Sequence, residues 1–152
     1  MSTSPPASAA ELRQRALRLL ARREHSRAEL ARKLAPHAAS AQELQTLLDS
    51  LIEKKQLSDE RYAAERAYWL ARKYGVARIA YALKQKGITT EIIQKATSEV
   101  VSTELDQALA IWQRKFGKHP NTRQDHARQT RFLQSRGFGL AVIQKILRRT
   151  DE

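Results

Sequence analysis

The stretch LKQKGITTEIIQK at residues 83–95 recurs fifty positions later, without a gap, as LQSRGFGLAVIQK at residues 133–145. A Lys-Gly pair in the first copy corresponds to an Arg-Gly pair in the second, and the apolar positions match on both sides of it. Internal repeats of this kind are typical of architectures in which a helical unit cannot bury its apolar face alone and stacks on its neighbours. The repeat therefore predicts a stack of similar units, which offers a long surface rather than a deep pocket.

The whole chain has the spacing of helices. Apolar residues recur every three or four positions, and we find no alternating pattern typical of a strand. Ser26 and Ser40 each precede a glutamate by three positions, which is the pattern of a capping box. Ser58 is expected to cap the next helix, and Gly75 is expected to end it in the left-handed conformation. Glycines 87, 117 and 137 are also expected to end helices.

We therefore expect an all-α fold of three tandem three-helix repeats that form an elongated, curved array of the right-handed type. The first unit is the most degenerate, with a Pro-His pair in place of Lys-Gly, and terminal repeats are commonly atypical. The Ser/Pro/Ala-rich start lacks the basic-then-apolar order of a signal peptide. The expected divisions are a disordered tail at 1–10 and units at 11–57, 58–102 and 103–152, the last with an inserted loop at 118–125.

The charge of the chain points to an anionic partner. It holds 28 lysines and arginines against 16 acidic residues, a formal net charge of +12. Residues 1–60 carry ten basic and eight acidic side chains, whereas residues 113–149 carry ten basic side chains and one acid, Asp125. A solubilising surface is the alternative explanation. Clustering of the basic residues on particular helices favours a polyanion such as nucleic acid.

The residue types exclude several kinds of chemistry. The chain has no cysteine, which excludes disulfides, thiolate metal sites and cysteine nucleophiles. The four histidines lack ligand spacing, and the acidic residues are not clustered as a metal-dependent nuclease would need. No segment approaches the roughly 18 apolar residues of a membrane span. We therefore expect no enzyme, no metal and no cofactor, and a cytoplasmic location.

The candidate binding residues are basic side chains of the second and third units. Arginine predominates in the third, which suits two-pronged contacts with phosphates. Arg128 and Arg131 lie three positions apart and share one face of a helix. A solvated helix face is the alternative for each of these residues. The set is Arg66, Arg72, Lys73, Arg78, Lys84, Lys86, Arg114, Lys115, Arg128, Arg131 and Arg136.

The aromatic residues fall at corresponding places in two units. Trp69 and Tyr74 lie in the second unit, and Trp112 and Phe116 lie in the third, all beside apolar neighbours. We expect these rings to pack in the core rather than to stack on bases.

The chain resembles the RecX family, the bacterial regulators of RecA recombinase. The similarity covers about residues 12–149 and is carried by ALRLLARREHSRAELARKL (16–34), LSDERYAAERAYWLARKYGVARIAYALKQKGI (57–88) and RFLQSRGFGLAVIQKIL (131–147). One departure is Val76, where the family pattern leads us to expect a proline. The individual motifs are short, but their order and spacing make the resemblance specific.

The resemblance implies binding to RecA–DNA filaments. We expect a monomer that contacts single- and double-stranded DNA directly or through the filament. The resemblance also implies inhibition of ATP hydrolysis, strand exchange and the co-protease activity, and hence effects on DNA repair and the SOS response. The family supplies no catalytic residues. Two alternatives are a general DNA- or RNA-binding protein and an all-helical adaptor for an acidic protein.

Overall fold

The computed structural model describes residues 5–148, which fold into nine α-helices and one short 3-10 turn, without a strand among them. The predicted all-α fold is confirmed. Consecutive helices form three groups, which we call units 1, 2 and 3. Unit 1 holds α1 (Ala9–Arg22), α2 (Arg27–Leu34), the 3-10 turn η1 (Ala35–His37) and α3 (Ala41–Glu53); unit 2 holds α4 (Asp59–Leu70), α5 (Val76–Gln85) and α6 (Thr90–Val101); unit 3 holds α7 (Glu104–Lys115), α8 (Arg123–Ser135) and α9 (Leu140–Leu147).

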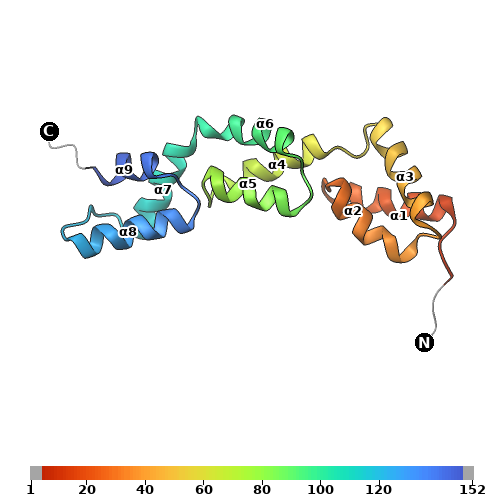
Figure 1. Ribbon diagram of the computed structural model, residues 1–152, viewed down its shortest axis with the longest axis horizontal. Helices are drawn as coiled ribbons and strands as arrows, with labels where there is room; N and C mark the ends of the chain where they lie inside the picture. Colours follow the sequence, from red (N-terminus) through yellow and green to blue (C-terminus); the bar gives the residue numbers. More distant parts are fainter. Residues whose placement is uncertain (1–4, 149–152) are drawn as a thin grey trace.

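The three units follow one another along the long axis of the molecule, as predicted (Figure 1). The N-terminal end of the chain lies at one end of this axis and the C-terminal end lies at the other. None of the helices within residues 5–148 is long and apolar enough to cross a membrane.

Each unit has its own apolar core. Leucines such as Leu30 and Leu48 fill the core of unit 1, whereas Ile79 and Leu83 lie at the centre of unit 2. Leu133 is buried at the position of unit 3 that corresponds to Leu83 in the repeat. The cores are separate, so the joints between units depend on other contacts.

The predicted helix starts are confirmed at three serines. The hydroxyls of Ser26, Ser40 and Ser58 each accept a hydrogen bond from the backbone N–H three residues later. Such caps satisfy one of the free N–H groups at a helix start.

The predicted tail at 1–10 is too long at its C-terminal end. Ser8 caps α1, so Ala9 and Ala10 are already helical, and the N–H of Ala7 donates to the carbonyl of His37 at 2.9 Å. A capping serine beside two alanines, the strongest helix formers, explains this early start. Residues 1–4 lie outside the described part of the chain.

The Lys/Arg-Gly pair of the repeat forms the joint between units. The hydroxyl of Ser26, at the start of α2, donates to the carbonyl of Lys86 at 2.8 Å. The N–H of Gly75, at the start of α5, donates to the carbonyl of Arg136 at 2.7 Å. In both cases the turn before the third helix of one unit lies on the start of the second helix of the preceding unit. At the corresponding turn of unit 1 the chain has Pro36 and His37 instead of the pair.

A carboxylate completes each joint. Asp59, the first residue of α4, accepts a hydrogen bond from the N–H of Arg27 at 2.7 Å. Glu104, the first residue of α7, accepts one from the N–H of Val76 at 2.9 Å. Each carboxylate therefore caps the second helix of the preceding unit, where the helix dipole favours negative charge.

The prediction for Gly75 is wrong. This residue begins α5 with φ −83°, an ordinary extended conformation, and does not end α4 in the left-handed region. Its small size is needed because an added Cβ would lie 2.4 Å from the carbonyl oxygen of Gly137. The predicted helix ends at Gly87, Gly117 and Gly137 are confirmed, and it is these glycines that are left-handed, with φ of 79°, 70° and 91°.

Candidate nucleic-acid interface

A basic groove lies where units 2 and 3 meet. It has a volume of about 540 Å³, and none of the residues that line it is acidic. We call it the junction groove. Its lining consists of Arg72, Lys73, Tyr74, Ile111, Arg114, Lys115, Phe132 and Arg136.

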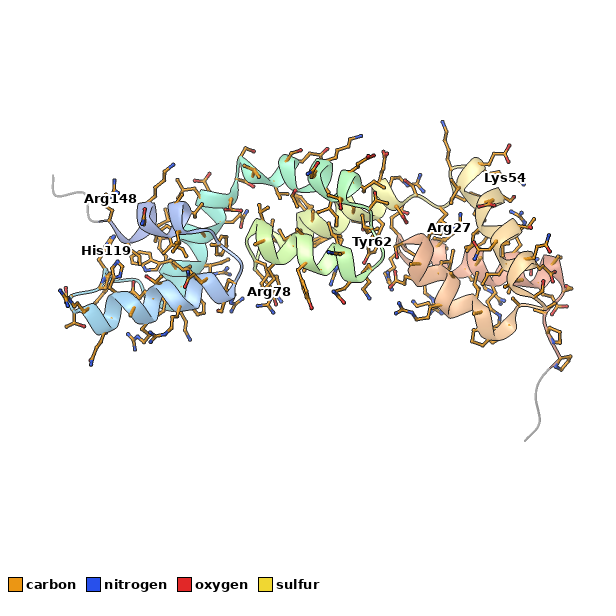
Figure 2. The ribbon with its side chains drawn as sticks, in the orientation of Figure 1. Arg27, Lys54, Tyr62, Arg78, His119 and Arg148 are labelled. Atoms are coloured by element: carbon orange, nitrogen blue, oxygen red, sulfur yellow. The ribbon has the colours of Figure 1, made fainter. Side chains whose placement is uncertain are left out.

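Aromatic rings hold several of these cations in place. Two guanidinium groups lie near the ring of Tyr74: that of Arg78 is 4.3 Å from the ring centre and that of Arg136 is 5.7 Å away. The ring of Phe132 has the guanidinium of Arg136 5.1 Å from its centre and the ammonium of Lys115 5.5 Å from it. A cation above an aromatic face is attracted by the ring quadrupole. Figure 2 shows Arg78 at the boundary between the two units.

The same arrangement continues along α7 and α8. The ring of Phe116 meets that of Phe132 edge to face at 5.3 Å, and the guanidinium of Arg128 lies 5.7 Å from the centre of Phe116. Arg128 also lies 3.6 Å from the carboxylate of Asp125. It is therefore attached to the row of rings but partly neutralised.

Contacts of this kind orient a cation without cancelling its charge. Within residues 5–148, two of the predicted binding residues lie within ion-pair distance of a carboxylate: Lys86, 3.9 Å from Glu29, and Arg128. None of the other predicted residues lies within 4.0 Å of a carboxylate in that part of the chain. The junction groove is therefore strongly positive, which raises the local concentration of an anionic partner.

The structure brings most of the predicted residues together, but not all. Two of them, Arg66 and Lys86, line a different pocket, between units 1 and 2. Lys84 and Arg131 are exposed on α5 and α8 and line neither cavity. The remaining seven line the junction groove or join it through the aromatic rings: Arg72, Lys73, Arg78, Arg114, Lys115, Arg128 and Arg136.

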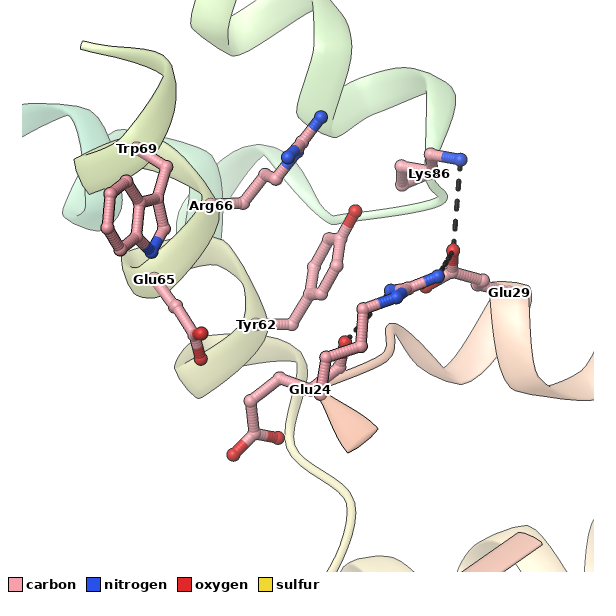
Figure 3. Close-up of a pocket in the computed structure, with 8 residues that line it drawn as sticks. Glu24, Glu29, Tyr62, Glu65, Arg66, Trp69 and Lys86 are labelled. Carbon is pink, nitrogen blue, oxygen red and sulfur yellow. Dashed lines mark hydrogen bonds and ion pairs between the residues drawn. The ribbon is translucent and has the colours of Figure 1, made fainter. Parts of the chain in front are cut away.

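The pocket between units 1 and 2, which we call the first-joint pocket, has mixed charge (Figure 3). Its volume is about 410 Å³, and Glu24 and Glu65 line it together with basic residues. Arg23 and Glu29 pair through two hydrogen bonds, at 3.0 and 2.8 Å. The hydrogen bond from Arg23 lowers the pKa of the Glu29 carboxyl to about 2, although burial opposes this shift.

A buried histidine lies behind this pocket. The Nδ1 atom of His25 lies 3.0 Å from the carbonyl oxygen of Arg23, and its Nε2 atom lies 3.1 Å from the ammonium of Lys33. The ring can donate to the first partner and accept from the second only when it is neutral. Burial, with these cations nearby, lowers the pKa of His25. Its role is structural, and within residues 5–148 no cluster of three potential metal ligands occurs.

The prediction that all the aromatic residues pack in the core is wrong for Trp69. Its side chain is 51% exposed, whereas Trp112 is 4% exposed and donates to the Gln129 side chain at 2.8 Å. Tyr74 and Phe116 are half-buried against the cores of their units, as predicted. Trp69 and Trp112 differ because their helices, α4 and α7, turn different faces towards their cores: Ala67 and Ala71 are buried beside Trp69.

The aromatic rings of the groove were not predicted to orient cations. For one of these contacts a signal exists in the sequence, because Phe132 and Arg136 are four positions apart, the spacing of neighbours on a helix. The contact of Phe132 with Lys115 joins two helices, and no spacing within one helix reveals it.

The fold and the groove define a helical-repeat protein with a basic surface at the joint between its second and third units. The comparisons with known proteins identify its family. Models of the first, second and third three-helix domains of RecX match residues 9–51, 58–96 and 102–147. The chain belongs to the RecX family, as the sequence resemblance indicated.

Its relatives are regulatory proteins. The chain is 46% identical to the regulatory protein RecX of Leptothrix cholodnii over 140 residues, which cover 92% of this chain and 89% of the relative. It is 40% identical to that of Ralstonia nicotianae over 146 residues, which cover 96% and 92%. The crystal structure of RecX from Lactobacillus salivarius shares the fold, with a TM-score of 0.81, 19% identity and coverage of 91% of this chain and 94% of that one. A regulatory role follows from this membership.

Proposed function

We propose that this chain binds the filament that RecA recombinase forms on DNA and inhibits its ATP hydrolysis, strand exchange and co-protease activity. The name of the family implies RecA as the partner, and the junction groove supplies a surface for it. A recombinase filament on DNA is a long anionic target, and the units are arranged in a line. We propose further that the protein acts in the cytoplasm as a monomer and is not an enzyme.

The observation that carries this proposal is the set of unneutralised cations in the junction groove. Arg72 and Arg114 come from units 2 and 3, respectively, and both line the groove. Each is exposed, so replacement by glutamate should leave the fold intact.

The test is DNA-dependent ATP hydrolysis by the cognate RecA, titrated with wild-type protein and with the double variant Arg72→Glu/Arg114→Glu. We expect the variant to need much more protein for the same inhibition. The matched control is Lys84→Glu/Arg131→Glu, which makes the same change of net charge outside the groove. Equal loss in both double variants would mean that net charge, rather than the groove, drives binding.

A general nucleic-acid-binding protein is the second candidate, and the net charge of +12 favours it. It predicts tight binding to naked duplex with a slope of log affinity against log salt near −0.9 per neutralised phosphate. It also predicts that inhibition of the recombinase follows occupancy of the DNA. Weak binding to naked DNA combined with strong inhibition would exclude it.

A further inference from the structure

A row of side chains on α4 and on the turn that follows it lies between the first-joint pocket and the junction groove. Arg66 and Trp69 lie three positions apart on α4, whereas Arg72 and Lys73 lie in the turn after its last residue, Leu70. Arg66 and Trp69 line the first-joint pocket, whereas Arg72 and Lys73 line the junction groove. We call this row the α4 stripe.

Trp69 is the uncovered aromatic residue of this stripe. About half of its side chain is exposed, and its ring contacts Tyr68 edge to face, with 5.6 Å between the ring centres. The guanidinium of Arg72 lies 5.1 Å from the centre of the ring. A large ring in water is costly because its apolar area stays hydrated. A flat ring between cations is the arrangement that proteins use to bind single-stranded nucleic acid.

We propose that Trp69 stacks on a base of single-stranded nucleic acid whose flanking phosphates bind Arg66 on one side and Arg72 and Lys73 on the other. Every base has a flat face, so the contact requires no particular sequence. A duplex cannot use it, because its bases are already stacked on one another. This inference rests on the nucleic-acid-binding part of the proposed function.

The carboxylates of the first-joint pocket limit the path of the strand. Glu65 lies one helical turn before Trp69 and lines the same pocket, as does Glu24 (Figure 3). Both repel phosphate, whereas the junction groove beyond Arg72 has no acidic lining. The strand is therefore expected to pass from Trp69 towards unit 3. Glu65→Gln, which removes one of these charges, should tighten binding.

The test is the binding of a fluorescently labelled oligothymidylate to the full chain, measured by anisotropy. Trp69→Ala should weaken binding between about 5-fold and 150-fold, the range that loss of one stacked base gives. Trp69→Phe, which keeps a ring, should retain most of the affinity. The matched control is Tyr81→Ala on α5: Tyr81 is 64% exposed but lines neither cavity, so its removal should change nothing.

A duplex of the same length separates stacking from a general loss of binding. Trp69→Ala should leave the affinity for duplex unchanged. Far-ultraviolet circular dichroism, compared with the wild-type chain, confirms that each variant keeps its helices.

Three results would overturn the inference. They are unchanged binding of the oligothymidylate by Trp69→Ala, an equal loss with duplex, and a loss of recombinase inhibition while oligothymidylate binding is kept. The last would assign Trp69 to a protein contact. Conversely, a wild-type protein that does not inhibit the recombinase but loses single-strand affinity in Trp69→Ala would refute the proposed function and support the stacking site.

Discussion

A glycine-to-alanine substitution, which adds one methyl group, tests the close contact at the joint between units 2 and 3. Gly75 and Gly139 begin α5 and α9 with nearly the same backbone conformation, φ −83° and ψ 173° against φ −77° and ψ 160°. A Cβ at Gly75 would lie 2.4 to 2.6 Å from backbone atoms of Gly137 and Phe138, whereas one at Gly139 would meet nothing within 4 Å. Alanine has the same local effect at both positions, so the difference between the two variants reports the joint.

The magnitude follows from the contacts. Forcing a methyl group into packed surroundings costs about 1–3 kcal/mol. The displaced backbone would also lose the 2.7 Å hydrogen bond from Gly75 to Arg136, which is worth about 0.5–1.5 kcal/mol. We therefore expect Gly75→Ala to lower the free energy of unfolding by about 1.5–4.5 kcal/mol more than Gly139→Ala does.

Urea unfolding followed by circular dichroism and by the emission of Trp112 measures this difference. Small-angle scattering should show a longer particle for Gly75→Ala, because the clash separates two units. Equal unfolding free energies for the two variants, within about 0.5 kcal/mol, would refute the close contact at the joint.

Three further predictions concern buried groups. Burial lowers the pKa of His25 below its usual 6.5, so below about pH 6.5 the unfolded chain takes up a proton that the folded chain does not. The free energy of unfolding should therefore fall as the pH drops below about 6.5. The variant His25→Leu should flatten this part of the curve of stability against pH. The pKa of Glu29 is about 2 in the folded chain and 4.5 in the unfolded chain. Its contribution to stability should therefore be complete above pH 4.5 and decline from there towards pH 2. Arg23→Gln should remove most of that decline, as measured by acid titration followed by circular dichroism. Trp112→Phe leaves the buried Gln129 oxygen without its donor and should cost about 1–3 kcal/mol in urea unfolding; a cost near zero would mean that water replaces the indole.

The repeat in the sequence predicts the fold because each later unit needs the same residues to dock on the unit before it. The Lys/Arg-Gly pair recurs since each later unit uses it to dock on the unit before it, at Ser26 in one joint and at Gly75 in the other. The capping serines can also be predicted from the sequence, because an N-cap depends on residues three positions apart. Local signals of this kind can be read without knowing the tertiary structure.

The failures have a common cause in contacts between units or between helices. Gly75 looks like a helix stop, but the backbone of Gly137, some sixty residues later, decides its role. Trp69 is a large aromatic residue of the kind that is usually buried, but the small alanines beside it fill that part of the core of unit 2. The cations of the junction groove could be predicted from the sequence, but which of them lie together could not, because Phe132 of α8 contacts Lys115 of another helix.

ATP hydrolysis by the cognate RecA on single-stranded DNA, titrated with this protein while the occupancy of the same DNA is measured in the same buffer, tests the central claim most directly. We expect inhibition at amounts of protein well below those that saturate the DNA, since the filament rather than free DNA is the proposed target. Inhibition that appears only at saturation of the DNA, or no inhibition at all, would contradict it.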